Sequence, residues 1–337
     1  MMQEFIKKLV KGEDLTPEEA GKAMEAIMAG AATPAQTAAF LTALRLKGET
    51  VEEIVAFARV MRSFADCIEP KVGPLVDTCG TGGDRCKTFN ISTITAFVMA
   101  GAGVSVAKHG NRSVTSKCGS ADLLEALGVR IDLPPKAVER VIEEVRIGFM
   151  FAPTFHMAMK HAAGVRKEIG IRTVFNILGP LTNPAGAKAQ LLGVYDTGLT
   201  EKMALVLRSL GSERALVVHG MEGLDEISIT GETMVSELKD GEVKSYTIGP
   251  REFGLVECSI GELEGGDPRE NAATALAILQ GEKGPRRDVV VLNAAAGIYV
   301  GGLAQSIKEG IPLAEGSIDS GRAYGKLKAL IERTKSS

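Results

Sequence analysis

The sequence predicts an α/β protein: a small all-helical N-terminal domain followed by a large α/β domain with a mostly parallel central sheet. Two observations predict this division. Residues 1–70 carry repeated helix start signals and apolar residues at helical spacing, whereas short β-like segments alternate with helices beyond Pro70. Because such alternation is typical of parallel sheets, we expect a helical domain at 1–70 and an α/β domain at 71–337. A later helix-containing segment, at about 156–190, is expected to join the helical domain.

The helical prediction depends on three start signals of one kind. Thr16, Thr33 and Thr50 are each followed three residues later by Glu or Gln, which is the pattern of a capping box. Pro17 and Pro34 occupy the first helical position, where a missing N–H costs nothing. These residues predict helices that begin directly after each threonine.

Composition limits the class of protein. The 337 residues are 45% hydrophobic and 24% charged, with a net charge of −3, which argues against a protein that mainly binds nucleic acid. No apolar segment reaches the roughly 18 residues of a membrane span, and the longest, at 289–300, is expected in the core. The five cysteines form no C-x-x-C pair, so neither a disulfide framework nor a zinc site is indicated, and a cytoplasmic location is expected.

A glycine-rich turn lies at residues 77–84, with the sequence Asp-Thr-Cys-Gly-Thr-Gly-Gly-Asp. An apolar strand precedes it and a helix is expected from Ser92 onward. Such a turn favours anions, because glycine allows close backbone approach and the free N–H groups of a helix start face the ligand. The pattern is neither the dinucleotide fingerprint nor the P-loop, so ordinary turn chemistry remains the alternative.

A second polar loop is expected at residues 108–116, after a buried strand at 103–107. Its donors stand where open α/β sheets bind ligands, and they could hold a phosphate or pyrophosphate; the alternative is a solvated loop. Ser120 is expected to cap a helix at 121–127.

Further candidates are charged or titratable. Asp225 and Glu226 follow a strand at 215–218 and suit Mg²⁺, although adjacent acids on a loop are also common in solvated surfaces. Arg166 could bind a carboxylate through two hydrogen bonds from its planar guanidinium, or could be an ordinary surface arginine. His109 and His156 could exchange protons or serve only in contacts.

Taken together, these motifs resemble the anthranilate phosphoribosyltransferase family over nearly the whole chain. The resemblance rests on residues 80–84, 88–93, 108–113, 119–122 and 172–184 and on the pair Asp225 and Glu226. It implies transfer of the phosphoribosyl group from 5-phosphoribosyl-1-pyrophosphate (PRPP) to the amine of anthranilate, with release of pyrophosphate, in the second step of tryptophan biosynthesis from chorismate. It also implies a homodimer formed through the helical domain, with no nucleic-acid or membrane partner.

The resemblance implies roles for individual residues. Those expected around PRPP are Gly80, Gly82, Gly83, Asp84, Thr88, Asn90, Ile91, Ser92, Thr93, Lys108, His109, Gly110, Asn111, Arg112, Ser113, Val114, Thr115, Ser116 and Ser120. Ser92, Asp225 and Glu226 are expected to bind Mg²⁺, with two ions in each active site. Those expected around anthranilate are Gly80, Asn111 and Arg166 at the reacting position and His109, His156, Arg172 and Gly179 along the entry channel. No general base is assigned, because positioning and electrostatics are expected to dominate.

Three segments depart from the pattern of the family. Met157 replaces a proline after His156, Gly164 replaces a proline before Arg166, and residues 85–87 are bulkier and more basic than usual. The nearest alternative is a pyrimidine nucleoside phosphorylase, which shares the fold, although such chains usually carry an additional C-terminal domain. A nucleic-acid-binding relative without activity is the other alternative, and the acidic pair at 225–226 argues against it.

Overall fold

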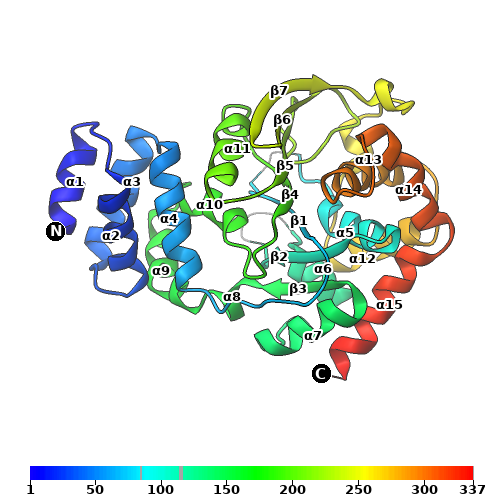
Figure 1. Cartoon of the computed structure of the whole chain (residues 1–337), viewed down its shortest axis with the longest axis horizontal. Helices are drawn as coiled ribbons and strands as arrows, with labels where there is room; N and C mark the ends of the chain where they lie inside the picture. Colours follow the sequence, from blue (N-terminus) through cyan, green and yellow to red (C-terminus); the bar gives the residue numbers. More distant parts are fainter. Residues whose placement is uncertain (84–85, 114–116, 337) are drawn as a thin grey trace.

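The computed structural model describes residues 1–83, 86–113 and 117–336, and contains a helical group beside a seven-stranded sheet (Figure 1). The helical group begins with α1 (Met2–Val10), α2 (Pro17–Met28), α3 (Pro34–Lys47) and α4 (Val51–Ser63). The three capping boxes are confirmed: in each one the threonine oxygen accepts from the backbone N–H three residues on, and the Glu or Gln side chain accepts in return.

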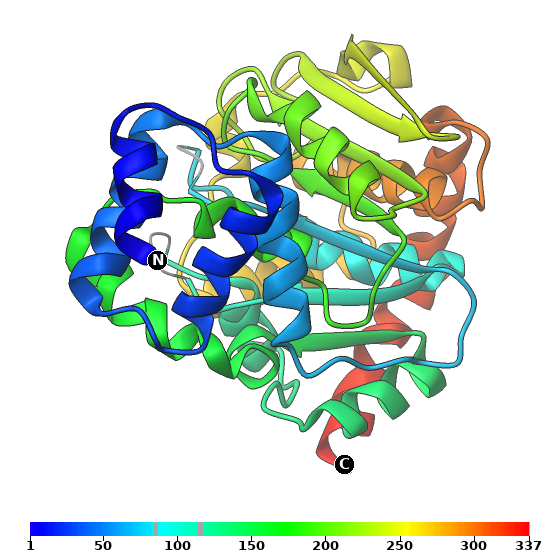
Figure 2. The ribbon, with the colours of Figure 1, turned by 60° about the vertical axis from the view of Figure 1, so that its left-hand side comes forward.

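A later part of the chain packs onto these helices. It contains α8 (Ala152–Phe155), η1 (Met157–Met159), α9 (Lys160–Ile169), α10 (Phe175–Leu178) and η2 (Gly179–Leu181). Helix α9 contacts α2 and α3, and α10 contacts α4. Phe40 and Phe57 meet edge to face in the core of this group, with ring centroids 6.1 Å apart, and Phe175 belongs to the same buried cluster. Figure 2 shows the group standing beside one end of the sheet.

The predicted α/β class with a mostly parallel sheet is confirmed. The strands are β1 (Leu75–Gly80), β2 (Ser105–Gly110), β3 (Ile147–Phe151), β4 (Ala189–Gly193), β5 (Arg214–Gly220), β6 (Thr233–Lys239) and β7 (Glu242–Ile248), in the spatial order β3-β2-β1-β4-β5-β6-β7. The first five are parallel and the last two form an antiparallel hairpin. As expected, Asp240 and Gly241 form the turn, each with positive φ (53° and 78°).

The two faces of the sheet are covered by different helices. Leu191 and Leu216 pack with α5 (Ile91–Ala102) and α13 (Pro285–Val300), whereas Leu192 and Val217 face α11 (Leu199–Ser209) and the helical group. The remaining elements of the α/β part are α6 (Ser120–Ala126), α7 (Pro135–Val145), η3 (Pro250–Phe253), η4 (Ile260–Leu263), α12 (Pro268–Leu279), α14 (Ile307–Asp319) and α15 (Arg322–Lys335).

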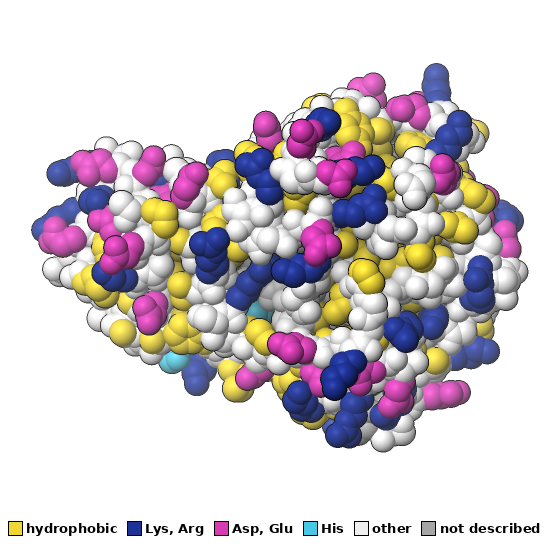
Figure 3. Space-filling view, in the orientation of Figure 1, with side chains coloured by type: hydrophobic (Ala, Val, Ile, Leu, Met, Phe, Trp, Pro, Cys, Tyr) yellow, Lys and Arg dark blue, Asp and Glu magenta, His cyan; other side chains and the backbone are white. Residues whose placement is uncertain are grey.

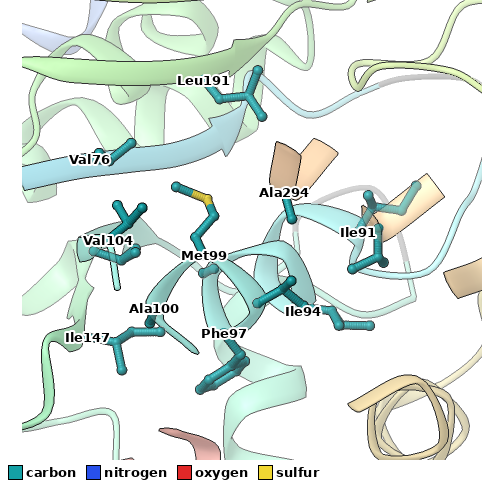
Figure 4. Close-up of a cluster of buried hydrophobic side chains, with 14 of the residues drawn as sticks. Val76, Ile91, Ile94, Phe97, Met99, Ala100, Val104, Ile147, Leu191 and Ala294 are labelled. Carbon is teal, nitrogen blue, oxygen red and sulfur yellow. The ribbon is translucent and has the colours of Figure 1, made fainter. Parts of the chain in front are cut away.

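Helix α5 lies at the centre of the larger core (Figure 4). Met99 and Phe97 are about 1% exposed or less, and burial of each such side chain contributes roughly 1.5–3 kcal/mol. A Cβ added at Gly297 would collide with Met99, so this glycine lets α13 approach α5 closely. The predicted core role of the apolar segment 289–300 is confirmed, since every one of its residues is buried in α13.

The strand order creates one topological switch point. From β1 the chain builds β2 and β3 on one side, and then β4 and β5 on the other. Ligands bind at such points in open α/β sheets, in the crevice at the carboxyl ends of the diverging strands. Within the described residues, none of the helices is both long and apolar enough to cross a membrane.

Candidate functional site

Asp225 lies across the carboxyl ends of β1 and β4. Its Oδ2 accepts a hydrogen bond of 2.8 Å from the backbone N–H of Gly82. A Cβ at Gly80 would collide with the Asp225 carboxylate, and a Cβ at Gly193 would collide with its backbone carbonyl. Both glycines are therefore required by close approach, and the acidic loop after β5 packs directly on the glycine-rich turn.

Glu226 points to the other wall of the crevice. Its side chain is 7% exposed, and Oε1 accepts a 3.0 Å hydrogen bond from the backbone N–H of Ser92, in the first turn of α5. Lys108 Nζ lies 3.4 Å from Ser92 Oγ and donates to the Thr78 carbonyl at 2.6 Å. The structure thus brings together an acid, a hydroxyl and an ammonium group from three distant segments.

Lys108 corrects one sequence-based expectation. The polar segment 108–116 was expected to be a loop, but Lys108, His109 and Gly110 form the end of β2. Lys108 is 4% exposed, and burial lowers the pKa of its ammonium while the nearby Asp77 carboxylate opposes this shift. The buried ammonium donates to the Thr78 carbonyl, and nearby carboxylates favour its charged form. The local sequence does not reveal these contacts.

Asp77 supports this strand from β1. It is fully buried; its Oδ1 accepts from the His109 N–H at 3.3 Å and its Oδ2 from Asn183 Nδ2 at 2.7 Å. Burial raises the pKa of Asp77 to about 6, and the amide of Asn183 and the charge of Lys108 limit the rise. Asp77 therefore ties β1, β2 and the segment that returns from the helical group.

The second polar loop is held by α6. Asp122 Oδ2 accepts from the N–H groups of Ser113 (3.0 Å) and Gly119 (2.8 Å). Arg112 pairs with Asp122 and Glu125, which raises the pKa of its guanidinium, so its charge is directed toward α6. Ser120 was expected to cap the helix, and this is wrong: Gly119 holds the cap position, and Ser120 Oγ donates to the Asn111 carbonyl at 3.2 Å.

His109 and His156 form a buried pair. They are 7% and 4% exposed, and their ring centroids lie 5.0 Å apart. Burial lowers the pKa of His109 to about 3, with a further contribution from His156, and lowers the pKa of His156 to about 4. Within the described part of the chain, neither His109 Nε2 nor the ring nitrogens of His156 make a well-aligned hydrogen bond, although backbone groups of Gly179 and Thr182 lie near the two rings and oppose the shifts. The pair is neutral at pH 7.

Two arginines reach this region from the segment that packs on the helical group. Burial lowers the pKa of Arg166, whose guanidinium lies 5.2 Å from the centroid of the Phe175 ring and makes no hydrogen bond or ion pair with the described residues. Arg172 donates to the Gly83 carbonyl and lies 4.2 Å from the Tyr195 ring, so it contacts the glycine-rich turn. The carbonyl of Gly179 accepts from Thr182 Oγ1 at 2.9 Å and lies near the ring of His109.

Family models match both parts of the chain. The model described as "Glycosyl transferase family, a/b domain" matches residues 72–324, and that described as "Glycosyl transferase family, helical bundle domain" matches residues 3–65. An anthranilate phosphoribosyltransferase from Acetivibrio thermocellus is 58% identical over 100% of this chain and 97% of its own length. The chain belongs to the anthranilate phosphoribosyltransferase family. The resemblance inferred from the motifs is thereby confirmed.

Solved structures of anthranilate phosphoribosyltransferases share this fold. The Thermus thermophilus protein superimposes with a TM-score of 0.93 at 48% identity, covering 98% of this chain and 99% of its own. The Saccharomyces cerevisiae protein in complex with PRPP and Mg superimposes with a TM-score of 0.92 at 31% identity, covering 100% and 98%. Another structure of the yeast protein contains 4-fluoroanthranilate.

The other predicted site residues of this family member lie nearby or are not described. Thr88 bridges to Glu264, Asn90 precedes α5, and Ile91 and Thr93 are buried within α5. Figure 3 shows Lys and Arg side chains gathered where the helical group meets the sheet, with a His side chain at their edge. Four predicted residues lie outside the described ranges: Asp84, Val114, Thr115 and Ser116.

Several supporting residues were missed. Asn293 of α13 accepts from the Ile227 N–H (3.0 Å) and donates to the Ile227 carbonyl (2.8 Å), which holds the chain beside Glu226. Glu222 accepts from the hydroxyls of Ser228 and Thr230 and so closes the same acidic loop. For Asn293 the sequence did contain a signal: it is an Asn inside an apolar helix, and a buried amide requires hydrogen-bond partners.

Proposed function

We propose that this protein transfers the phosphoribosyl group from PRPP to the amine of anthranilate and releases pyrophosphate. One observation carries the proposal: Glu226, Ser92 and Lys108 meet at the topological switch point, beside a glycine-rich turn and the start of a helix. Hydrogen-bond donors that bind anions, together with carboxylates that can hold Mg²⁺, suit a substrate with several phosphates. The yeast relative solved in complex with PRPP and Mg supports the same assignment.

PRPP is proposed to lie across two segments. The first phosphate segment runs from the glycine-rich turn to the start of α5, and the second phosphate segment is the loop between β2 and α6. The N–H groups at the start of α5 and the Lys108 ammonium provide positive potential for the pyrophosphate. The loop that follows β2 is held by Asp122 and is proposed to contact the other end of PRPP. The sugar between them would place its anomeric carbon over the end of β1.

Mg²⁺ fits the carboxylates. No group of three or more His, Cys, Asp or Glu side chains suited to a metal occurs in the described ranges, whereas Mg²⁺ commonly binds one or two carboxylates together with substrate phosphates. Ser92, Asp225 and Glu226 are the oxygen donors proposed to hold it, with two ions in each site. When bound, Mg²⁺ neutralises charge on the departing pyrophosphate.

Anthranilate is proposed to enter beside the neutral histidines. Arg166 has a guanidinium without an ion-pair partner among the described residues, and it can bind the anthranilate carboxylate with two parallel hydrogen bonds. His109 and His156 offer uncharged imidazoles for contacts with the aromatic acid. Asn111 and the backbone at Gly80 are proposed to face the amine, and Arg172 and Gly179 to border the entry path.

The reaction then requires little covalent participation by the protein. The bond from the anomeric carbon to pyrophosphate breaks, the bond from that carbon to the anthranilate nitrogen forms, and the nitrogen loses one proton. Lys108 and the N–H groups of α5 stabilise the growing negative charge, and Arg166 orients the nucleophile. No general base is assigned.

The assembly and location of the protein extend this proposal. We propose a homodimer formed through the helical group, following the resemblance to the family, and a cytoplasmic location consistent with five cysteines that form no disulfide.

The test is the loss of anthranilate fluorescence after mixing with PRPP and Mg²⁺. We expect the wild-type protein to consume anthranilate, and the variant Glu226→Gln to lose at least about a hundredfold in Mg²⁺-dependent kcat. Glu232→Gln is the matched control, because Glu232 is exposed in the same region of the chain. Persistence of anthranilate with folded protein, together with consumption of thymidine and phosphate, would instead support a nucleoside phosphorylase.

A further inference from the structure

Asn90, which ends the connection into α5, has a side chain in an unusual role. An Asn at a helix N-cap normally accepts from an N–H of the first turn, but the Asn90 side chain makes no such bond. Its Nδ2 instead donates to the Cys118 carbonyl at 3.0 Å, and its Oδ1 accepts from Asn271 Nδ2 at 3.0 Å. The cap residue therefore links the first phosphate segment to the second one and to α12.

The two amides form a chain of fixed direction. Asn271 Oδ1 accepts from the Gly266 N–H at 2.8 Å, which leaves its Nδ2 to face Asn90. Because the chain begins at a backbone donor and ends at a backbone acceptor, the Cys118 carbonyl, neither amide can turn over without placing like atoms together. Asn271 is 3% exposed, so a lost partner would not be replaced readily by solvent.

The segment before α12 supports the same region through its backbone. Phe89 N–H donates to the Leu263 carbonyl at 3.2 Å, and Gly265 N–H donates to the Lys87 carbonyl at 3.0 Å. A Cβ at Gly265 would lie 2.7 Å from the backbone of Phe89. Residues 263–271 therefore form a brace, made of backbone and one amide, against the end of the first phosphate segment.

We infer that Asn271 is a positioning residue for PRPP, which fixes the spacing between the start of α5 and the loop that contains Cys118. The inference rests on the proposed function, because the two segments are assigned to the two ends of PRPP. Asn271 lies on α12 and acts through Asn90. Its effect should therefore be specific to the substrate with two anionic ends, and anthranilate binding should not depend on it.

The test compares Asn271→Asp with wild type in separate titrations of the two substrates. The carboxylate still accepts from Gly266 but places an oxygen opposite Asn90 Oδ1, so either the link to Asn90 or the link to Cys118 is lost. We expect the KM for PRPP to rise roughly tenfold, as for loss of one buried hydrogen bond, while the KM for anthranilate stays within about twofold. Calorimetric binding of PRPP with Mg²⁺ should show the same change without turnover.

The control is Ala273→Ser, an exposed position on the same helix. It should leave both KM values unchanged. If Asn271→Asp does not fold, the same two KM values are measured for Asn271→Ser, whose side chain is too short to reach Asn90. An unchanged KM for PRPP, or equal increases for both substrates, would overturn the inference. Wild-type protein that neither turns over nor binds PRPP would instead contradict the proposed function itself.

Discussion

His156 is predicted to make the protein sensitive to acid. Its imidazole is 4% exposed, and burial lowers its pKa from 6.5 to about 4, although the Thr182 backbone and Asp66 oppose the shift. The folded state thus favours the neutral ring. The stability associated with this neutral ring is complete above pH 6.5 and is lost as the pH falls toward 4, because the unfolded chain binds the proton first.

The size of the effect follows from the two pKa values. At pH 5 the unfolded side chain, with a pKa of 6.5, is largely protonated, whereas the folded one, with a pKa of about 4, is largely neutral. The pH lies 1.5 units below the unfolded pKa, and each unit corresponds to about 1.4 kcal/mol, so roughly 2 kcal/mol of unfolding free energy is lost between pH 8 and pH 5.

Urea unfolding of wild type and His156→Gln at pH 8 and pH 5 measures this difference. The substitution changes stability at both pH values through packing, but the gap between the two proteins should shrink by about 2 kcal/mol at pH 5. His161→Gln is the control, because His161 is exposed on α9. A gap between wild type and His156→Gln that is the same at both pH values would refute a neutral, buried His156.

Three further substitutions test other parts of the structure. Arg166→Ala should raise the KM for anthranilate about ten- to a hundredfold, as expected for a lost charged hydrogen-bond pair, whereas Lys167→Ala on the exposed face of α9 should not; equal kinetics would remove Arg166 from the site. Gly193→Ala should abolish most activity, because its Cβ would displace the backbone of Asp225, and a fully active variant would contradict that packing. Thr50→Ala should lower the free energy of unfolding by about 1 kcal/mol, measured in urea, and no loss would show that the capping box contributes nothing.

Features set by neighbouring residues were predictable from the sequence. The capping boxes at Thr16, Thr33 and Thr50 and the turn at Asp240 and Gly241 involve residues within four positions of each other, so the sequence contains the whole interaction. The α/β class follows from strand and helix alternation in the same way.

Features set by distant residues were not predictable in this way. Lys108 lies buried in β2, where its ammonium donates to the Thr78 carbonyl of the neighbouring strand, and no local pattern contains that contact. Asn271 resembles any helical Asn until its partner, 181 residues away in sequence, is known. The family resemblance supplied the proposed substrate contacts, but not the amides of Asn271 and Asn293 that hold neighbouring segments in place.

The adjacent pair Asp225 and Glu226 serves both walls of the crevice. Asp225 accepts from the Gly82 N–H and Glu226 from the Ser92 N–H. Backbone N–H groups of this kind also bind phosphate. Carboxylates and phosphates therefore compete for the same positive potential, and two anions cannot share it without a cation. We infer that the pair lowers the affinity of this crevice for free phosphate and makes PRPP binding depend on Mg²⁺. Glu226→Gln should therefore bind inorganic phosphate more tightly than wild type in Mg²⁺-free calorimetry, and an unchanged or weaker affinity would contradict this competition.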